Sequence, residues 1–241
     1  DDAFTAQKQF SASAAHELRT PLAVMQTNLE VFARKKTPTI EEYQDIFGMI
    51  QNQTERLSHL SEVLLDMTGI QSVERSDSIS LAELTDEVCC DLASIADQKK
   101  VELIQEEGDC TVTGSYLLLY RAVYNLVENA IKYNHSGGKV TVKISQKKDL
   151  PAAHSKPADY ALVEVTDTGI GISPEFQEKI FDPFFRVDKS RSRAMGGAGL
   201  GLALVAEIAR QHGGQVKVLA SSKKGSTIAL MLPINSPLIE I

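Results

Sequence analysis

Apolar side chains recur at alternating steps of three and four along the first seventy residues, and no segment there alternates as a strand would. The first run comprises Phe10, Ala14, Leu18, Leu22, Met25, Leu29 and Phe32, and the second comprises Ile46, Ile50, Gln53, Leu57, Leu60, Leu64 and Met67. The connecting stretch ARKKTPTIEEY offers Thr39 as the N-cap of the second run. This pattern predicts two long helices joined by a short loop.

A single helical hairpin buries too little apolar surface to be stable alone. Pairing two hairpins into a four-helix bundle would cover both apolar seams. We therefore predict a homodimer through residues 1–70. The alternative is a hairpin that packs against its own second domain, which the length of the seams makes less favourable.

The pattern changes near GIQSVERSDSIS, residues 69–80, which we interpret as a polar linker. This gives two predicted domains, residues 1–72 and 78–235. Beyond the linker, helices are predicted at 81–99, 116–134, from 173 and at 201–214, and strands at 101–107, 110–114, 139–146, 160–167, 215–221 and 226–233.

Ser173 and Pro174 are suited to the N-cap and first position of the third of these helices. Residues 147–159 are polar and predict a long exposed loop between two strands. Helices combined with a mainly antiparallel sheet predict an α+β sandwich for the second domain.

Composition narrows the function classes. The 241 residues suit one large or two modest domains, and a formal net charge of -7 argues against general nucleic-acid binding, which needs a basic face. Cys89, Cys90 and Cys110 lack metal-ligand spacing and are interpreted as reduced thiols. No apolar run approaches the roughly 18 residues that span a membrane, and no signal peptide is recognised. The first residues are already helical, which favours a piece of a longer chain.

Four polar side chains share one stripe of the predicted helix 116–134. Asn125 and Asn129 are four residues apart, and Lys132 and Tyr133 follow three and four later. The alternative is a solvated helix face, but such a face is more usually rich in Glu and Lys. Paired asparagines offer neutral oxygens for Mg²⁺ and donors for phosphate.

Asp167 ends a predicted strand and is followed by Gly169 and Gly171. A carboxylate in this place can accept a hydrogen bond from an exocyclic amine, and the glycines let the backbone approach a planar base. The alternative is an ordinary turn, and D-x-G-x-G is weak evidence by itself.

Cations and glycines meet where the last predicted helix begins. The cations are Arg186, Lys189, Arg191 and Arg193, and the glycines are Gly196, Gly197, Gly199 and Gly201. Backbone N–H groups at a helix start favour anions, and glycines permit a flap that excludes water. The spacing differs from a Walker loop. KKGST, residues 223–227, is a weaker glycine turn.

In this order, HELRTP, NLVENAIKY, DTGIGI, FDPFFR and GGAGLGL resemble the H, N, G1, F and G2 boxes of two-component sensor histidine kinases. Each motif is modest, but five in order over nearly the whole chain are highly specific. The resemblance implies a dimeric four-helix bundle followed by a Bergerat-type ATP-binding α+β sandwich.

The resemblance also implies roles for the first motif. His16 would be the phosphoacceptor, and Glu17 would fix its tautomer or accept its proton. Thr20 would position a water molecule for dephosphorylation of a phosphorylated partner. Pro21 removes a backbone hydrogen bond to Glu17. We hypothesise that a bend there lets the helix present or withhold His16; the alternative is a tolerated kink.

By the same resemblance, ATP and Mg²⁺ would bind in the second domain. Asn129 would coordinate the metal, Asp167 would accept from the adenine amine, and residues 173–199 would form a lid. The remaining nucleotide contacts would come from Asn125, Lys132, Tyr133, Gly169, Gly171, Arg186, Gly197, Gly199, Leu200, Gly201 and Thr227.

The expected function is that of a bacterial sensor histidine kinase core. It would autophosphorylate His16, transfer the phosphoryl group to an aspartate of a response-regulator receiver domain, and dephosphorylate that regulator. The core would be cytoplasmic, anchored to the cell membrane only by segments outside this chain. Two alternatives stay open: a gyrase- or chaperone-type ATPase, which would lack the histidine hairpin, and a degenerate kinase that serves as a scaffold.

Overall fold

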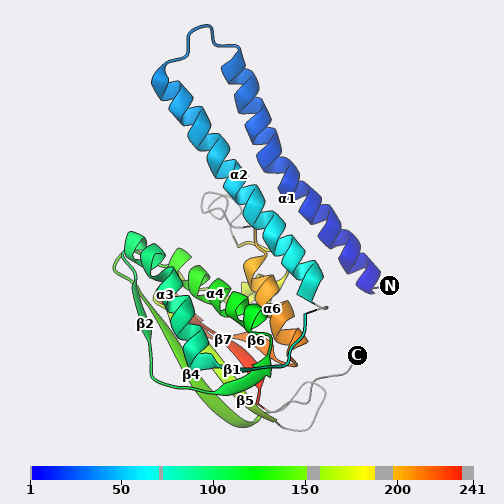
Figure 1. Cartoon of the computed structure of the whole chain (residues 1–241), viewed down its shortest axis with the longest axis vertical. Coiled ribbons are helices and arrows are strands. Elements are labelled where there is room, and N and C mark those ends of the chain that lie inside the picture. The colour runs from blue at the N-terminus through cyan, green and yellow to red at the C-terminus, as the bar shows by residue number, and fades with distance from the viewer. Residues whose placement is uncertain (1, 71–72, 151–157, 188–197, 235–241) are drawn as a thin grey trace.

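The computed structural model describes residues 2–70, 73–150, 158–187 and 198–234. Two long helices, α1 (Asp2–Ala33) and α2 (Ile40–Gly69), form a hairpin that extends away from a mixed body of helices and strands (Figure 1). Thr39 and Glu42 cap α2 reciprocally, because the Glu42 N–H donates to Thr39 Oγ1 at 3.3 Å and the Thr39 N–H donates to Glu42 Oε2 at 3.0 Å. The predicted hairpin and N-cap are confirmed.

Helix α1 continues through Pro21 to Ala33 without a break. The proline ring removes one backbone hydrogen bond, so the helix is locally weakened just after His16. The Thr20 hydroxyl donates to the His16 carbonyl oxygen at 3.1 Å, which adds a side-chain hydrogen bond in the same turn.

The hairpin leaves much of its apolar surface uncovered within one chain. Leu22 and Leu29, both in the predicted seam of α1, are 53% and 45% exposed. Further exposed apolar side chains on the two helices are Val24, Val31, Ile40, Tyr43 and Phe47. Only near its C-terminal end does α2 bury seam residues, with Leu60 at 2% exposure.

The second part of the chain is built on a five-stranded sheet in the order β2-β4-β5-β7-β6. Its strands are β2 (Glu102–Gln105), β4 (Lys139–Leu150), β5 (Ala158–Asp167), β6 (Gln215–Ser222) and β7 (Gly225–Pro233). Strands β2 and β4 pair in parallel and the other neighbours are antiparallel, which confirms the mainly antiparallel sheet.

A separate two-stranded sheet pairs β1 (Asp77–Ser80) with β3 (Thr111–Gly114). The prediction that residues 69–80 are only a polar linker is therefore wrong for its last four residues. Ile79 is buried at the centre of β1, and one apolar side chain in a polar run gave too little periodicity to identify a strand.

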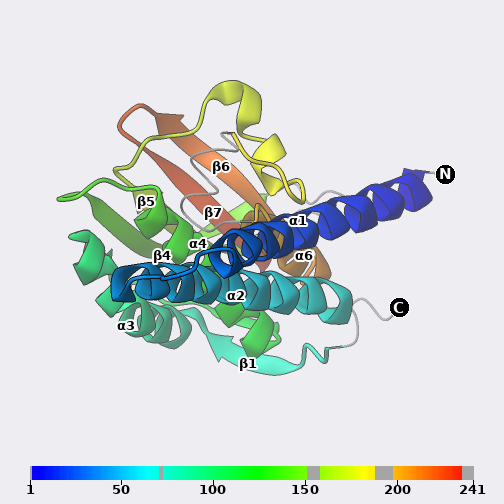
Figure 2. The same cartoon turned by 90° about the horizontal axis from the view of Figure 1, so that it is seen from above.

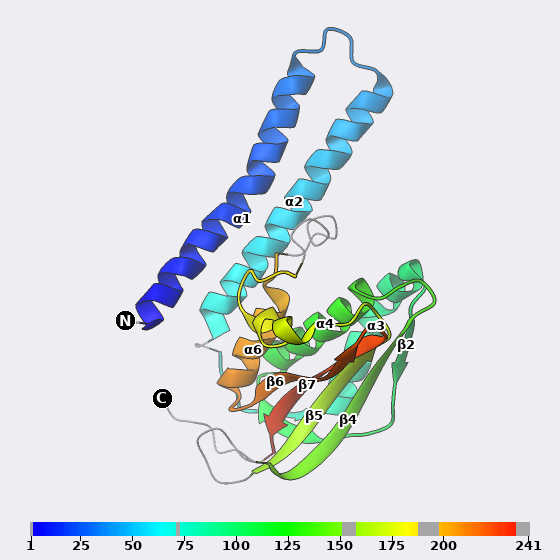
Figure 3. The same ribbon diagram turned by 180° about the vertical axis from the view of Figure 1, so that it is seen from behind.

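Three helices, α3 (Leu81–Lys99), α4 (Tyr116–Lys132) and α6 (Gly201–Gln211), form a layer between the sheet and the hairpin (Figures 1 and 3). Seen from above, the hairpin lies over this helical layer (Figure 2). The core between helices and sheet is fully buried, and it includes Leu119, Ile131, Leu204, Ile208, Val163 and Leu230.

A helix predicted from Ser173 onward is wrong. The structure has two short 3₁₀ turns, Pro174–Phe176 and Lys179–Phe181, and Ser173 makes no capping hydrogen bond through its side chain. Asp182 follows in an extended conformation. It precedes Pro183, whose ring disfavours the helical region for the residue before it.

The His212 ring joins the C-terminal end of α6 to the N-terminal end of α4. The Ser115 N–H donates to His212 Nε2 at 3.0 Å, so Nε2 is unprotonated and Nδ1 donates to the Ile208 carbonyl at 2.8 Å. Burial lowers the pKa of His212, because the charged ring would be desolvated. The neutral ring thus fixes how these two helices meet.

Within the described residues, the helices are all too short or too polar to cross a membrane.

Candidate nucleotide and phosphotransfer site

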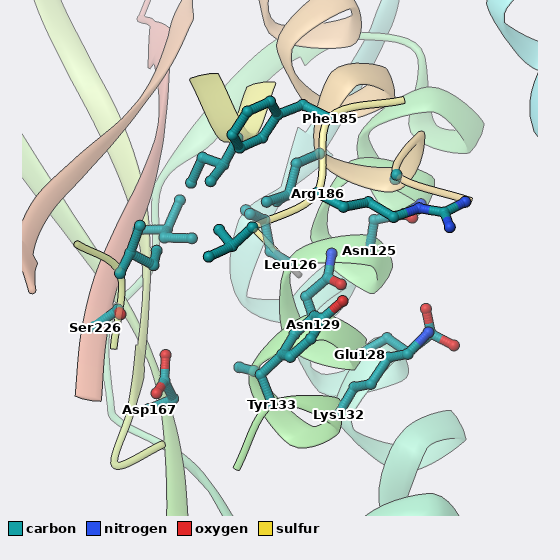
Figure 4. Close-up of a pocket in the computed structure, with 18 of the residues that line it drawn as sticks. Asn125, Leu126, Glu128, Asn129, Lys132, Tyr133, Asp167, Phe185, Arg186 and Ser226 are labelled. Atoms are coloured by element: carbon teal, nitrogen blue, oxygen red, sulfur yellow. The ribbon is translucent and has the colours of Figure 1, made fainter. Parts of the chain in front are cut away.

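A cavity of about 420 Å³ lies between α4, the end of β5, the 3₁₀ turns and the start of α6 (Figure 4). Most of the predicted nucleotide residues line it: Asn125, Asn129, Lys132, Tyr133, Asp167, Gly171, Arg186, Gly199, Leu200 and Gly201. Gly197 lies outside the described residues, as do Lys189, Arg191, Arg193 and Gly196. Asp167 and Ser226 lie across the cavity from Arg186 and Asn125 (Figure 4).

Helix α4 carries the polar stripe along one wall of the cavity. The Asn125 amide donates to the Arg121 carbonyl at 2.8 Å, which fixes the side chain. A Cβ at Gly201 would overlap Asn125 Oδ1, so the start of α6 approaches this asparagine only because residue 201 is glycine. Burial lowers the pKa of Lys132, and the nearby Glu128 carboxylate opposes this shift.

Asp167 occupies the other end of the cavity. Its carboxylate accepts hydrogen bonds from the Gly169 N–H at 2.7 Å and from the Ser226 N–H. Burial raises the pKa of Asp167, while the two backbone donors lower it. A half-buried carboxylate held by two backbone donors retains further lone pairs for a ligand amine.

The two glycines after Asp167 allow close backbone packing. A Cβ at Gly169 would overlap the Tyr133 carbonyl oxygen, and Gly169 contributes to the site through this packing without lining the cavity. Gly171 has φ 72°, and a Cβ there would overlap the Ser222 carbonyl oxygen. The loop after β5 is thus pressed against the turn between β6 and β7.

Ser226 lines the cavity, whereas the predicted Thr227 does not. The Thr227 hydroxyl lies 3.0 Å from that of Thr166 on the neighbouring strand. Adjacent residues of a strand point to opposite faces, so the choice between them depends on the register of Asp167 with Ser226. The glycine turn KKGST located the turn but not this register.

The start of α6 and Arg186 form the end of the cavity suited to anions. Gly199 (φ 73°) accepts a hydrogen bond at 2.8 Å from the N–H of Phe184 (φ 64°), so Phe184 lies next to the start of α6. The Arg186 side chain is only 4% exposed. In the described part of the chain its buried Nε has no hydrogen-bond partner.

Arg186 also contacts the hairpin. Its Nη2 lies 2.7 Å from Glu17 Oε2, and Arg56 of α2 approaches the same oxygen at 3.4 Å. Phe10 and Phe184 pack with ring centroids 5.5 Å apart. Leu60 and Val63 of α2 help to line the cavity itself. Arg186 therefore lines the cavity and also contacts Glu17, the residue next to His16.

His16 is solvent-exposed and does not line the cavity. It lines a surface groove with Arg19, Thr20, Ala23, Val24, Thr27 and Asn28. Glu17 is turned toward the two arginines, consistent with the divergence of adjacent side chains on a helix.

A metal ion would find few protein ligands in this cavity. Among the described residues, no group of three or more His, Cys, Asp or Glu side chains is arranged to hold one. Mg²⁺ bound with a nucleotide takes one or two protein oxygens and completes its shell with phosphates and water. The Asn129 amide and the neighbouring Glu128 carboxylate fit such a site.

Comparisons with known proteins agree with this arrangement. Residues 6–72 match the His Kinase A (phospho-acceptor) domain, and residues 114–236 match the histidine kinase-, DNA gyrase B-, and HSP90-like ATPase family. Sensor histidine kinase RppB of Synechocystis is 34% identical over 95% of this chain and 50% of its own length. Sensor histidine kinase WalK of Bacillus subtilis is 31% identical over 94% of this chain and 36% of its own length.

The chain thus spans half or less of the length of these two relatives. Among solved structures, histidine kinase ThkA in complex with response regulator protein TrrA superposes with a TM-score of 0.71 at 21% identity, over 96% of this chain and 63% of that one. This structural likeness confirms the fold. The chain belongs to the histidine kinase-, DNA gyrase B- and HSP90-like ATPase family, and with its phospho-acceptor hairpin it is the catalytic core of a two-component sensor histidine kinase.

Proposed function

We propose that this core binds ATP, phosphorylates His16 and passes the phosphoryl group to an aspartate of a response-regulator receiver domain. The observation that carries the proposal is Arg186, which lines the nucleotide cavity and binds Glu17, the residue next to His16. The Arg186 guanidinium thereby links the cavity suited to phosphates with helix α1, which carries the proposed phosphoacceptor His16.

The two ends of the cavity suit the two ends of ATP. Asp167 would accept a hydrogen bond from the adenine amine. The phosphates would meet the N-terminus of α6, the Asn125 amide and Arg186 Nε, which supply donors and positive charge. Asn129 would hold Mg²⁺, which neutralises charge on the phosphates.

Phosphorylation requires an imidazole nitrogen of His16 to attack the γ-phosphorus while ADP leaves. The nitrogen forms the new P–N bond as the bond to the bridging oxygen breaks, and Glu17 would receive the ring proton. In the described arrangement Glu17 is held by Arg186 and Arg56, and His16 lines a separate surface groove. We therefore infer that the ATP-binding part shifts along the hairpin before transfer.

The groove beside His16 is the proposed docking surface for the receiver domain, together with the nearby Ala12 and Ala15. ThkA was solved as a complex with response regulator protein TrrA, which supports a partner of this kind. We also propose a phosphatase activity toward the regulator. For Thr20 to position a water molecule, its hydroxyl would have to release the His16 carbonyl.

The exposed seam of the hairpin is the proposed homodimer interface, through residues 1–70. A second copy would cover Leu22 and Leu29, which the single chain leaves exposed. The whole protein is proposed to add sensing and membrane-anchoring segments, with this core on the cytoplasmic side. Relatives that are longer and named sensor kinases support that placement.

The test is incubation with γ-labelled ATP and magnesium beside the His16→Gln and Asn129→Asp variants. We expect label that is acid-labile and base-stable in the parent and absent from both variants. Unlabelled parent that still binds ATP would contradict the kinase assignment and favour the scaffold alternative, unless the core dephosphorylates a labelled receiver domain, which would identify a phosphatase-locked state.

A further inference from the structure

The turn between β6 and β7 carries two serine hydroxyl groups that the nucleotide-binding motifs do not include. Ser221 and Ser226 lie at the two sides of this turn, with their hydroxyl oxygens 2.9 Å apart. Ser226 is 5% exposed and lines the cavity beside Asp167, and Ser221 lies behind it as seen from the cavity lining.

Ser221 joins this turn to the loop that follows Asp167. The Ile172 N–H donates to Ser221 Oγ at 2.7 Å, and Ile172 itself lines the cavity. The same loop touches the turn at a second point, where Gly171 packs on the Ser222 carbonyl too closely to admit a Cβ. The loop is therefore attached to the turn by one side-chain hydrogen bond and one backbone contact.

The turn between β6 and β7 also holds the Asp167 carboxylate. The Ser226 N–H donates to it, and Ser226 pairs with Asp167 in the register of β7 with β5. Removing the Ser221 hydroxyl would leave the Ile172 N–H without its acceptor and the Ser226 hydroxyl without its neighbour. The loss of this part-buried hydrogen bond would weaken the attachment of the loop to the turn beside Asp167.

The single proton of the Ser221 hydroxyl limits the hydrogen bonds that this side chain can make. A hydroxyl has one proton and two lone pairs, and one lone pair of Ser221 is taken by Ile172. Its proton can go to Ser226 Oγ at 2.9 Å or to the Gly225 carbonyl at 3.5 Å. The shorter contact is the better hydrogen bond, and either serine hydroxyl can be its donor.

We propose that Ser221 is a positioning residue that holds Asp167 and Ser226 in the geometry that recognises the 6-amino edge of a purine. It touches no ligand. Its effect is selectivity for ATP over purine nucleotides that lack this amine. The inference rests on the proposed function, because it assumes that the base of ATP lies at Asp167.

The experiment compares two nucleotides on the whole chain by calorimetry: ATP, and purine riboside triphosphate, which lacks the 6-amino group. We expect Ser221→Ala to weaken ATP binding about five- to tenfold, the size of one lost hydrogen bond. Binding of the analogue should change less than about twofold. Ser221→Thr keeps the hydroxyl and should restore ATP binding.

Ser222→Ala is the matched control. Ser222 lies beside the same turn and is exposed. Within the described residues, its hydroxyl accepts a hydrogen bond from the Lys224 N–H. It should leave both affinities unchanged. Should Ser221→Ala fail to fold, Ser221→Cys gives the same contrast, because a thiol is a weaker acceptor.

Equal losses for the two nucleotides would mean a purely structural role and would overturn the inference, as would unchanged ATP binding in Ser221→Ala. Failure of the proposed function has a different signature: the parent chain would bind neither nucleotide, or would bind both equally well.

Discussion

The hairpin and the ATP-binding part treat apolar surface differently. Leu22 on α1 and Leu117 on α4 are almost equally exposed, at 53% and 54%. Leu22 belongs to a long seam with other exposed apolar side chains, whereas α4 buries its opposite face in a closed core with Leu119 and Ile131. Equal exposure can therefore have different meanings: we propose an interface for a second copy at the hairpin and an ordinary surface position at Leu117.

The largest expected effect comes from placing a charge at Leu22 and, for comparison, at Leu117. Leu22→Glu should raise the Kd of the proposed dimer at least about a hundredfold. Burying a leucine contributes about 1.5–3 kcal/mol, and burying a carboxylate in its place is unfavourable. Leu117→Glu should leave the dimer intact. Analytical ultracentrifugation measures both.

ATP affinity should stay within about twofold in both variants, since the cavity lies within one chain. Dissociation by Leu117→Glu, or a dimer that tolerates Leu22→Glu, would show that the hairpin seam is not the interface.

A second prediction concerns the effect of acid on the ATP-binding part. The pKa of His212 is lowered in the folded chain, so the unfolded chain binds the proton more readily. The contribution of the neutral ring is fully present above the ordinary pKa of about 6.5 and is lost as pH falls toward the lowered folded value. Urea unfolding between pH 7.5 and 5.5 should show stability falling with acid.

His212→Gln should remove that part of the pH dependence, because an amide does not titrate. The difference between the two proteins isolates His212 from the other histidines. An identical pH dependence in both would contradict the role of the ring.

The smallest expected effect concerns the stability contributed by the N-cap of α2 in the hairpin. Thr39→Ala removes the capping oxygen of α2 and should lower stability by about 1 kcal/mol. Thr37→Ala, two residues earlier in the exposed connection, is the control and should change little. Thermal unfolding followed by circular dichroism at 222 nm would detect the difference, and equal melting temperatures would argue against the cap.

Periodicity was sufficient where one face of an element is buried. It identified both long helices, the stripe of Asn125 and Asn129 on α4, and the strand that ends at Asp167. The same rule failed for β1, which is too short to show a period, and for residues 173–181, which form two short 3₁₀ turns in place of one helix.

Other features depend on contacts that no local pattern contains. Ser226 rather than Thr227 lines the cavity because of the β5–β7 register. The pairing of Arg186 with Glu17 joins residues 169 positions apart. Sequence motifs predicted a nucleotide role for one and a phosphotransfer role for the other, but only the tertiary structure brings the two together.

The buried ring of His212 has a consequence at the far end of the two helices that it joins. Helices α4 and α6 meet at Ser115 and His212 on one side and at Asn125 and Gly201 on the other, where the phosphates are proposed to bind. We therefore expect the separation of the two helices at the phosphate end to depend partly on the neutral His212 ring, which accepts the Ser115 N–H at their other end. By thermodynamic linkage we then expect ATP and a proton on His212 to be antagonists that do not share a site, each weakening the affinity for the other by the same factor.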